Sequence, residues 1–197
     1  MLSTFPRLRF GLGLMVGIGG AVPGEQNDIR LGDVVVSKPG IKHSGVILYT
    51  YGMTIPGGFE QTGTLNKPPQ ILLTHINQLQ AKHMGSEDVL QIVQQVLEGD
   101  PNMKKSFSPE YDTDYLFQPS YHHASRDKDC GKCDKQQLVD RHPRDTRAPH
   151  IHYGLIASAD QVMKDSEARD RLAQEHGILC FEMEAAGLMD KLPTLVI

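Results

Sequence analysis

Cysteine is scarce in this sequence, and tryptophan is absent from it. The 197 residues include three cysteines, Cys130, Cys133 and Cys180, which are too few for the disulfide framework that staples small secreted domains. A chain of this length can instead bury an apolar core of its own. The N-terminal residues also lack an apolar stretch followed by a secretory cleavage site. We therefore expect a reducing, cytoplasmic setting.

Long apolar runs and a strong charge of one sign are missing as well. Glycine or polar residues interrupt every apolar stretch before it reaches the length of a membrane-spanning helix. The net charge of -4 argues against a broad electrostatic contact with nucleic acid or an anionic membrane. We expect neither kind of partner.

What the sequence does contain is an alternation of short apolar runs with helical periodicity. The runs that predict strands are 12–16, 33–37, 46–51, 151–157, 178–181 and 194–197. Helices are predicted after Pro68-Pro69, from Ser86 to Gly99, and over 164–176 and 183–191. This alternation predicts an α/β fold with a mainly parallel or mixed sheet between helices. We expect one domain over 1–197, interrupted by a polar insertion at 100–149 that has little periodicity.

A glycine-rich segment, Gly17-Ile18-Gly19-Gly20, follows the first predicted strand. Glycines allow a sharp turn and the close approach of backbone N–H groups to an oxyanion, so the segment could seat a phosphate. The alternative is a tight turn at a strand end, because short glycine motifs are weak signals.

Two carboxylates, Glu182 and Glu184, flank Met183 where a short strand meets a helix. A carboxylate at the carboxyl edge of a sheet can accept both vicinal hydroxyls of a ribose. The alternative is the ordinary preference for acidic residues at a helix N-terminus. Another strand runs into Ser158 and is followed by Gln161 and Val162, which is typical of either a ligand edge or a turn before a helix.

The pair Cys130 and Cys133 is spaced as C-x-x-C, with His122, His123 and His142 nearby. Such a pair can bind one zinc ion when a histidine completes the site. Only one pair is present, so free thiols in a loop are the favoured interpretation and no metal site is assigned.

Three strings together resemble the nucleoside phosphorylase and nucleosidase superfamily, which includes purine nucleoside phosphorylases and methylthioadenosine nucleosidases. The strings are GIGGAVPGEQNDIRLGDVVVS (17–37), HYGLIASADQVMKDSEARDRL (152–172) and CFEMEAAGLMDKLPTLVI (180–197). The nearest likeness is to fungal proteins in which such a domain is often joined to ankyrin, tetratricopeptide or NACHT-type segments. The resemblance implies a three-layer αβα sandwich of the phosphorylase/hydrolase type with a mixed central sheet.

The resemblance also implies cleavage of the N-glycosidic bond of purine nucleosides, by phosphorolysis or hydrolysis. It implies purine nucleoside and phosphate as substrates, no metal or organic cofactor, and a homo-oligomer. Gly17, Ile18, Gly19 and Gly20 match the positions that seat phosphate or water beneath the sugar. The remaining matches are Glu184 for the ribose hydroxyls, Met183 for packing on the sugar, Glu182 for the preceding family glutamate, and Gln161 and Val162 for the border of the base.

The sequence departs from the superfamily at the general acid. In the superfamily an Asp follows the strand that matches 194–197, whereas this sequence stops at Ile197. The superfamily's opening strands are also shortened or missing before Leu12, together with the basic phosphate contact expected there. We therefore expect a domain truncated at both ends and assign no catalytic residue. Two interpretations stay open: an incomplete enzyme, or a catalytically silent nucleoside-binding or assembly module.

Overall fold

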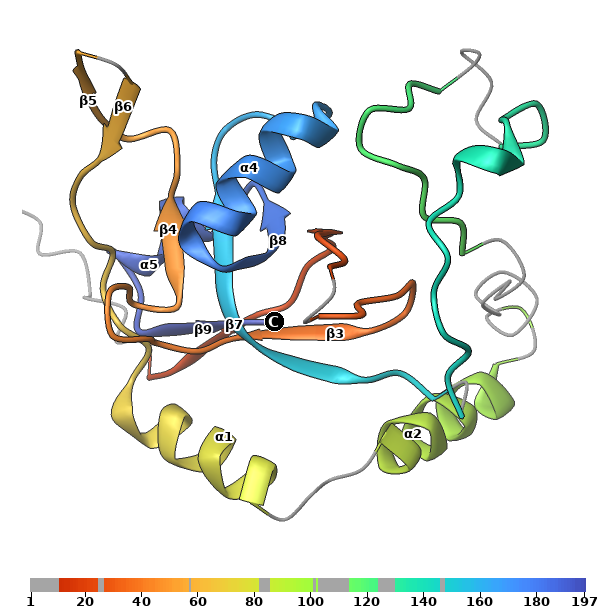
Figure 1. Cartoon of the computed structure of the whole chain (residues 1–197). Coiled ribbons are helices and arrows are strands. Elements are labelled where there is room, and N and C mark those ends of the chain that lie inside the picture. The colour runs from red at the N-terminus through yellow and green to blue at the C-terminus, as the bar shows by residue number, and fades with distance from the viewer. Residues whose placement is uncertain are drawn as a thin grey trace, which may run out of the picture.

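Parallel strands from the two halves of the chain form the centre of the molecule (Figure 1). The computed structural model describes residues 11–24, 27–56, 58–81, 86–100, 102, 114–123, 130–145 and 148–197. The strands are β1 (Gly13–Met15), β2 (Gly20–Ala21), β3 (Val34–Ser37), β4 (Val46–Leu48), β5 (Gly52–Ile55), β6 (Gly58–Gln61), β7 (Ile151–Ser158), β8 (Ile178–Glu182) and β9 (Thr194–Val196). The helices are α1 (Gln70–Ala81), α2 (Ser86–Gly99), α4 (Ser166–His176) and α5 (Ala185–Met189), with a 3-10 turn η2 (Lys135–Gln137).

Strand β7 organises the sheet. On one side its first half pairs with β3 and its second half with β4, in both cases parallel. On the other side it pairs in parallel with β8, which in turn pairs antiparallel with β2. β1 and β9 form a separate parallel pair beside β3, and the Val196 N–H donates to Ser37 Oγ at 3.1 Å. The fold is therefore α/β with a mixed sheet, as the sequence predicts.

Both faces of β7 are covered, which produces the layered arrangement. Leu155 and Ala157 lie on one face in an apolar cluster that also receives side chains of α4. Ile156 points to the opposite face and packs with Ala185 and Met189 of α5. Because successive residues of a strand point to opposite faces, a continuous apolar run is needed to bury both. This explains why the β7 sequence does not alternate with polar residues.

The predicted elements are all present, with shorter bounds at several ends. Helix α1 begins directly after Pro69, as predicted, and Ile76 packs against Val36 and Leu195. Helix α5 covers five residues where nine were predicted, and it begins at Ala185, whose N–H donates to Glu182 Oε2. The β5–β6 hairpin and the two-residue strand β2 were not predicted.

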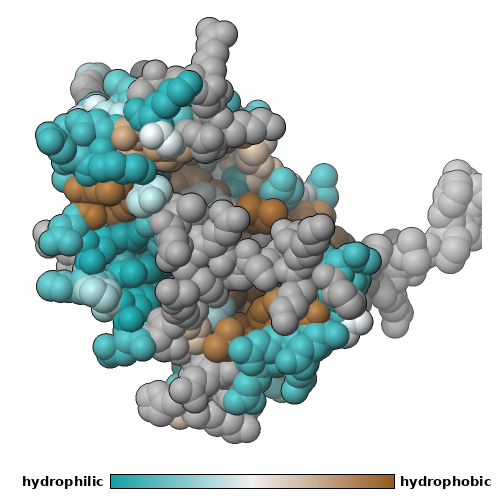
Figure 2. Space-filling model, turned by 90° about the vertical axis from the view of Figure 1, so that its right-hand side faces the viewer, coloured by the Kyte–Doolittle hydropathy of each residue, from teal (hydrophilic) through white to brown (hydrophobic). Residues whose placement is uncertain are grey.

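Helix α2 exposes apolar side chains that the period of its sequence would place on a buried face. Its apolar side chains repeat with helical period, yet Ile92, Val93 and Val96 are exposed. Figure 2 views the molecule from the side on which α2 and the insertion lie in Figure 1, and it shows apolar patches between hydrophilic areas. The period of a helix predicts an apolar face but does not determine what covers it.

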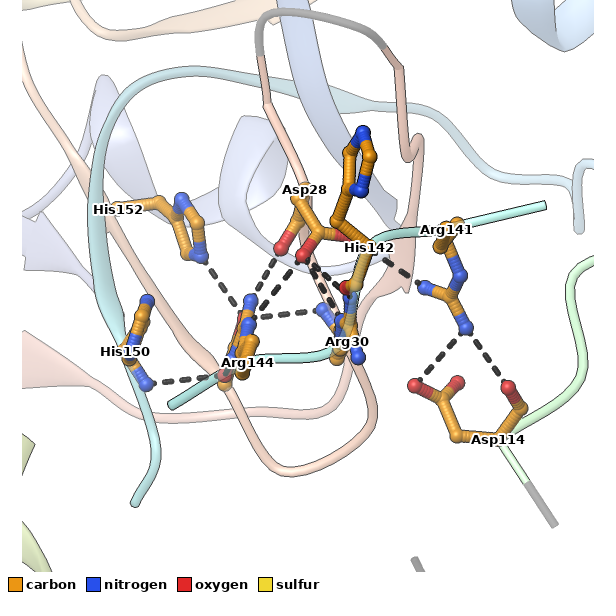
Figure 3. Close-up of polar contacts among 9 residues, drawn as sticks. Asp28, Arg30, Asp114, Arg141, His142, Arg144, His150 and His152 are labelled. Carbon is orange, nitrogen blue, oxygen red and sulfur yellow. Dashed lines mark hydrogen bonds and ion pairs between the residues drawn. The ribbon is translucent and has the colours of Figure 1, made fainter. Parts of the chain in front are cut away.

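Charged residues attach the end of the insertion to the body of the protein (Figure 3). The Asp33 side chain is 1% exposed, and Arg144 binds it through both Nη1 and Nη2, at 2.8 and 2.6 Å. His152 Nε2 of β7 lies 2.9 Å from the same carboxylate, and the His150 N–H donates to it. These contacts hold the pKa of Asp33 well below its usual range, against the opposing effect of burial.

The network extends outward to residues nearer the surface. Arg144 also binds Asp28, which pairs with Arg30 at 2.8 Å. Arg141 binds Asp114 at 3.0 Å, so the two described segments of the insertion, 114–123 and 130–145, are joined as well. The whole network lies at the amino ends of β3 and β7.

None of the helices in the described part of the chain is both long and apolar enough to cross a lipid bilayer.

Candidate functional site

The carboxyl ends of three parallel strands meet at one edge of the sheet. Ser158 at the end of β7 is paired with Glu182 at the end of β8 and with Leu48 at the end of β4. Ligands of open α/β sheets bind at this edge. A pocket of about 250 Å³ lies here, lined by Ile18, Gly20, Ala21, Gln161, Val162, Met163, Arg169, Phe181, Glu182, Met183 and Glu184.

This pocket brings together residues from three predicted segments that are far apart in the sequence. The predicted site residues that line it are Ile18, Gly20, Gln161, Val162, Glu182, Met183 and Glu184. Gly17 and Gly19 are not among the lining residues, and Cys130 and Cys133 belong to the insertion. The grouping of the three segments follows from the parallel pairing of β7 with β8 and from the β2–β8 pairing, which carries the glycine segment to the same edge.

The glycine segment differs in detail from an open cradle of backbone amides. The Gly17 N–H donates to the Ile197 carbonyl at 3.1 Å, so this group is already used inside the protein. Neither Gly19 nor Gly20 has the positive φ that favours glycine. A Cβ on Gly19 would lie 3.3 Å from both Cys180 Sγ and the Phe181 carbonyl oxygen. Gly19 therefore permits close approach to β8, while Ile18 and Gly20 line the pocket.

Glu182 and Glu184 have different environments although they are two residues apart. Glu182 is buried, and its Oε2 accepts the N–H groups of Glu184 and Ala185 at 2.9 and 2.8 Å. This carboxylate satisfies amide groups at the start of α5, which is the structural role expected of an acid at a helix N-terminus. Its Oε1 is buried and has no hydrogen-bond partner among the described residues.

Glu184 is exposed and contributes no side-chain hydrogen bond to the helix cap. Its Oε2 accepts the N–H of Met183 at 3.1 Å, a contact that orients the carboxylate. The α5 amide next in sequence is satisfied from β7, because the Ala186 N–H donates to Ser158 Oγ at 3.0 Å. Since Glu182 and Ser158 supply the cap, the Glu184 carboxylate stays available at the pocket.

Arg169 is a lining residue that sequence reasoning missed. It comes from α4, whose N-terminus is capped by Asp165 through the Ala168 N–H at 2.9 Å. Its Nε lies 2.6 Å from the carboxylate of its neighbour Asp170. The arginine lies inside the 152–172 string, but nothing in its local sequence distinguishes it from the other charged residues of that helix. It adds a guanidinium group to a lining that also contains the carboxylates of Glu182 and Glu184.

The rest of the lining is apolar and rigidly supported. Phe181 packs edge-to-face against Tyr49 with ring centroids 5.2 Å apart. The Tyr49 hydroxyl donates to the Gln161 carbonyl at 3.5 Å, which ties the segment after β7 to this ring. Cys180 lies behind the glycine segment, and burial raises the pKa of its thiol to about 12. The exposed side chains of Val162 and Met183 could contact an apolar group of a ligand while its polar groups meet Glu184 and Arg169.

A larger cavity of about 300 Å³ lies beside β4, and its lining includes Lys42, His43, Leu48, Tyr51, Gln61 and Asp190. None of the predicted site residues belongs to it. The smaller pocket is the candidate site because the predicted residues line it, although its volume is smaller. Among the described residues, side chains that could hold a metal ion gather away from both cavities, at His123, Cys130 and Cys133.

The chain is similar to a curated protein of a fungus. Over its whole length of 197 residues, the chain is 41% identical to a protein of Hyaloscypha variabilis described as a nucleotide-binding leucine-rich repeat (NLR)-like protein. The chain spans 19% of the length of that relative. No family model matches the chain, and no solved structure matches it significantly.

Proposed function

We propose that this chain is a purine nucleoside-binding domain of the nucleoside phosphorylase type, which cleaves the N-glycosidic bond by phosphorolysis or hydrolysis. One observation carries the proposal. Seven residues chosen from three separated strings line a single pocket at the carboxyl edge of the sheet. Unrelated turns and caps have no reason to meet in this way.

The pocket offers the groups that a nucleoside requires. Glu184 has two carboxylate oxygens with which to accept the vicinal hydroxyls of a ribose. Phe181, Val162 and Met163 provide an apolar wall for a purine ring. Ile18 and Gly20 line the pocket and match the positions that seat phosphate or water in the superfamily, and Arg169 supplies a cation for an anionic co-substrate.

The same groups would favour the bond-breaking step. Cleavage of an N-glycosidic bond builds positive charge on the ribose, so a fixed carboxylate and an anion beneath the sugar stabilise the transition state. The chemistry proposed here requires no metal or organic cofactor. Departure of the purine is faster when an acid protonates it. The carboxylates that line the described pocket are Glu182 and Glu184, and Glu182 is engaged at the start of α5.

The second candidate function is binding of a nucleoside without turnover, as an assembly or sensing module. The capping contacts of Glu182 Oε2 favour it, because they commit this carboxylate to the start of α5. The 41% identical relative, of which the chain spans 19%, supports a role within a larger protein. We propose a cytoplasmic location from the small number of cysteines, and a homo-oligomer from the resemblance to the nucleoside phosphorylase superfamily.

A phosphorolysis assay separates the two candidates. The purified chain is incubated with inosine or adenosine, with and without phosphate, and free base is measured by chromatography. Release that depends on phosphate supports phosphorolysis, and release without phosphate supports hydrolysis. Saturable nucleoside binding without release supports the binding module. Absence of both release and binding contradicts the proposal.

A further inference from the structure

A group of metal-ligating side chains in the insertion plays no part in the proposed site. His123, Cys130 and Cys133 each offer one ligand atom, and these three atoms lie within 4.8 Å of one another. Cys130 Sγ is 3.8 Å from His123 Nε2. Cys133 is buried, Cys130 is half-buried and His123 is exposed. Two thiols and one imidazole therefore lie close enough together to share one metal ion.

Backbone pairing brings the histidine to the two cysteines. The Gln118 N–H donates to the Gln137 carbonyl and the Val139 N–H to the Leu116 carbonyl, both at 2.8 Å. These bonds align 114–123 with 130–139, and the Phe117–Leu138 bridge lies between them. The cluster therefore rests on a paired scaffold and not on an unsupported loop.

Further contacts fix the ends of this scaffold next to the cluster. The Asp134 N–H, directly after Cys133, donates to the Tyr121 hydroxyl at 2.8 Å. The Cys133 N–H donates to the Cys130 carbonyl at 3.2 Å, which closes a turn that directs both thiols to the same side. His123 follows Tyr121 by two residues and so lies close to this turn.

The distances match those of a tetrahedral metal centre. Zinc bonds of about 2.3 Å to sulfur and 2.0 Å to nitrogen place neighbouring ligand atoms about 3.5–3.8 Å apart. The Cys130–His123 separation of 3.8 Å is already in this range. The remaining separations, at most 4.8 Å, require side-chain movements of about 1 Å, which rotamer adjustment supplies.

The insertion has little apolar material to stabilise it. Among its described residues between 114 and 145, the buried apolar side chain is that of Cys133. Phe117 and Tyr121 stack at 5.2 Å but are only half-buried, and the Lys135 ammonium covers the ring of the exposed Tyr115 at 3.5 Å. A metal cross-link is the usual substitute for a core in segments of this size.

We propose that His123, Cys130 and Cys133 bind one structural zinc ion that cross-links the insertion. Two thiolates and a neutral imidazole match the ligand preference of zinc, which undergoes no redox change. The fourth position is left to water or to a further side chain. This interpretation was an alternative in the sequence, where three histidines were equally placed, and the backbone pairing selects His123 among them.

The test is metal analysis of the full chain, expressed with zinc and purified under reducing conditions. We expect about one zinc per chain by plasma mass spectrometry. We also expect the metal-free chain to bind Co²⁺ with the visible absorption of tetrahedral sulfur and nitrogen ligation. A chelator should expose two thiols to a colorimetric reagent, while Cys180 stays unreactive in the folded protein because burial raises its pKa to about 12.

Variants assign the ligands, with a neighbouring histidine as the matched control. His123→Ala and Cys133→Ser should each lower the affinity for Co²⁺ at least about tenfold, whereas His122→Ala should retain it. Equal binding by the two histidine variants would overturn the assignment of His123. If the cysteine variant does not fold, Co²⁺ titration of the reduced wild-type chain still decides. Absence of a tetrahedral spectrum, or a Cys130–Cys133 disulfide that persists in reductant, would overturn the proposal.

Discussion

At the scale of single residues, Gly17 and Gly19 belong to the same glycine segment but differ in the space that each leaves for a side chain. A Cβ on Gly19 would meet a backbone oxygen and a buried sulfur, both at 3.3 Å, whereas one on Gly17 would meet only the flexible end of Met15 at 3.8 Å. Neither glycine has a positive φ. A side chain added at either position would therefore be opposed by packing and not by the backbone conformation.

This difference predicts unequal effects of the same substitution. Gly19→Ala should destabilise the fold by about 1–3 kcal/mol, because Phe181 and the glycine segment must move apart. Gly17→Ala should change the free energy of unfolding by less than about 0.5 kcal/mol. Urea denaturation of both variants measures this. Equal effects would show that the segment does not pack against β8 as described.

The two pocket glutamates illustrate what a sequence can and cannot distinguish. A ribose ligand and a helix cap were alternatives for the same string, because both call for an acid at a strand–helix junction. The structure gives the capping contacts to Glu182 and leaves Glu184 exposed at the pocket. Arg169 could not be recognised, since its place at the pocket depends on how α4 lies across the sheet.

At the scale of elements, helix α4 is bounded by recognisable caps. Asp165 accepts the Ala168 N–H at 2.9 Å, and Gly177 ends the helix with a φ of 75°. Asp165→Ala should lower the free energy of unfolding by about 1 kcal/mol, because a helix N–H loses its acceptor. Asp165→Asn keeps an acceptor oxygen and should have little effect. Thermal or urea unfolding of the two variants compares them, and an equal loss in both would contradict the cap.

Sequence patterns predicted where strands and helices occur better than they predicted which elements pair or pack with one another. The β-branched run of β3 and the apolar run of β7 indicated strands, because both faces must be buried. Strand β2 has two residues, too few for any period, and is recognised only through its pairing with β8. The apolar face of α2 was predicted from its period, but its exposure was not, because packing partners are a tertiary property.

At the scale of the whole molecule, the Asp33 network joins three regions of the chain. It links the segment before β3, the end of the insertion and the start of β7 through contacts of Arg144, His150 and His152. It lies at the amino ends of the strands, opposite the edge that carries the pocket. Its loss should therefore weaken the fold without changing the groups that line the site.

The depressed pKa of Asp33 predicts how stability depends on pH. A group whose pKa is lower in the folded than in the unfolded state stabilises the protein above its unfolded pKa. This contribution is therefore complete at neutral pH and decreases as the pH falls from about 5 through the ordinary aspartate range. Urea unfolding between pH 7 and pH 3 measures it.

Asp33→Asn serves as the comparison for that titration. At pH 7 the variant should be less stable by about 3 kcal/mol, because Arg144 loses its buried anionic partner. The difference between wild type and variant should shrink on acidification. A difference that is constant with pH would show that the pKa of Asp33 is the same in the folded and the unfolded protein, which would contradict the network.

The central claim is that Glu184 holds the sugar of a nucleoside at the carboxyl edge of the sheet. Calorimetric titration of adenosine and inosine into Glu184→Gln tests it most directly, with Glu175→Gln on the exposed surface of α4 as the matched control. Loss of a charged acceptor for two hydroxyls should weaken binding at least about tenfold, while the control binds as the wild type does. Unchanged affinity of Glu184→Gln, in a protein that binds the nucleoside, would contradict the account.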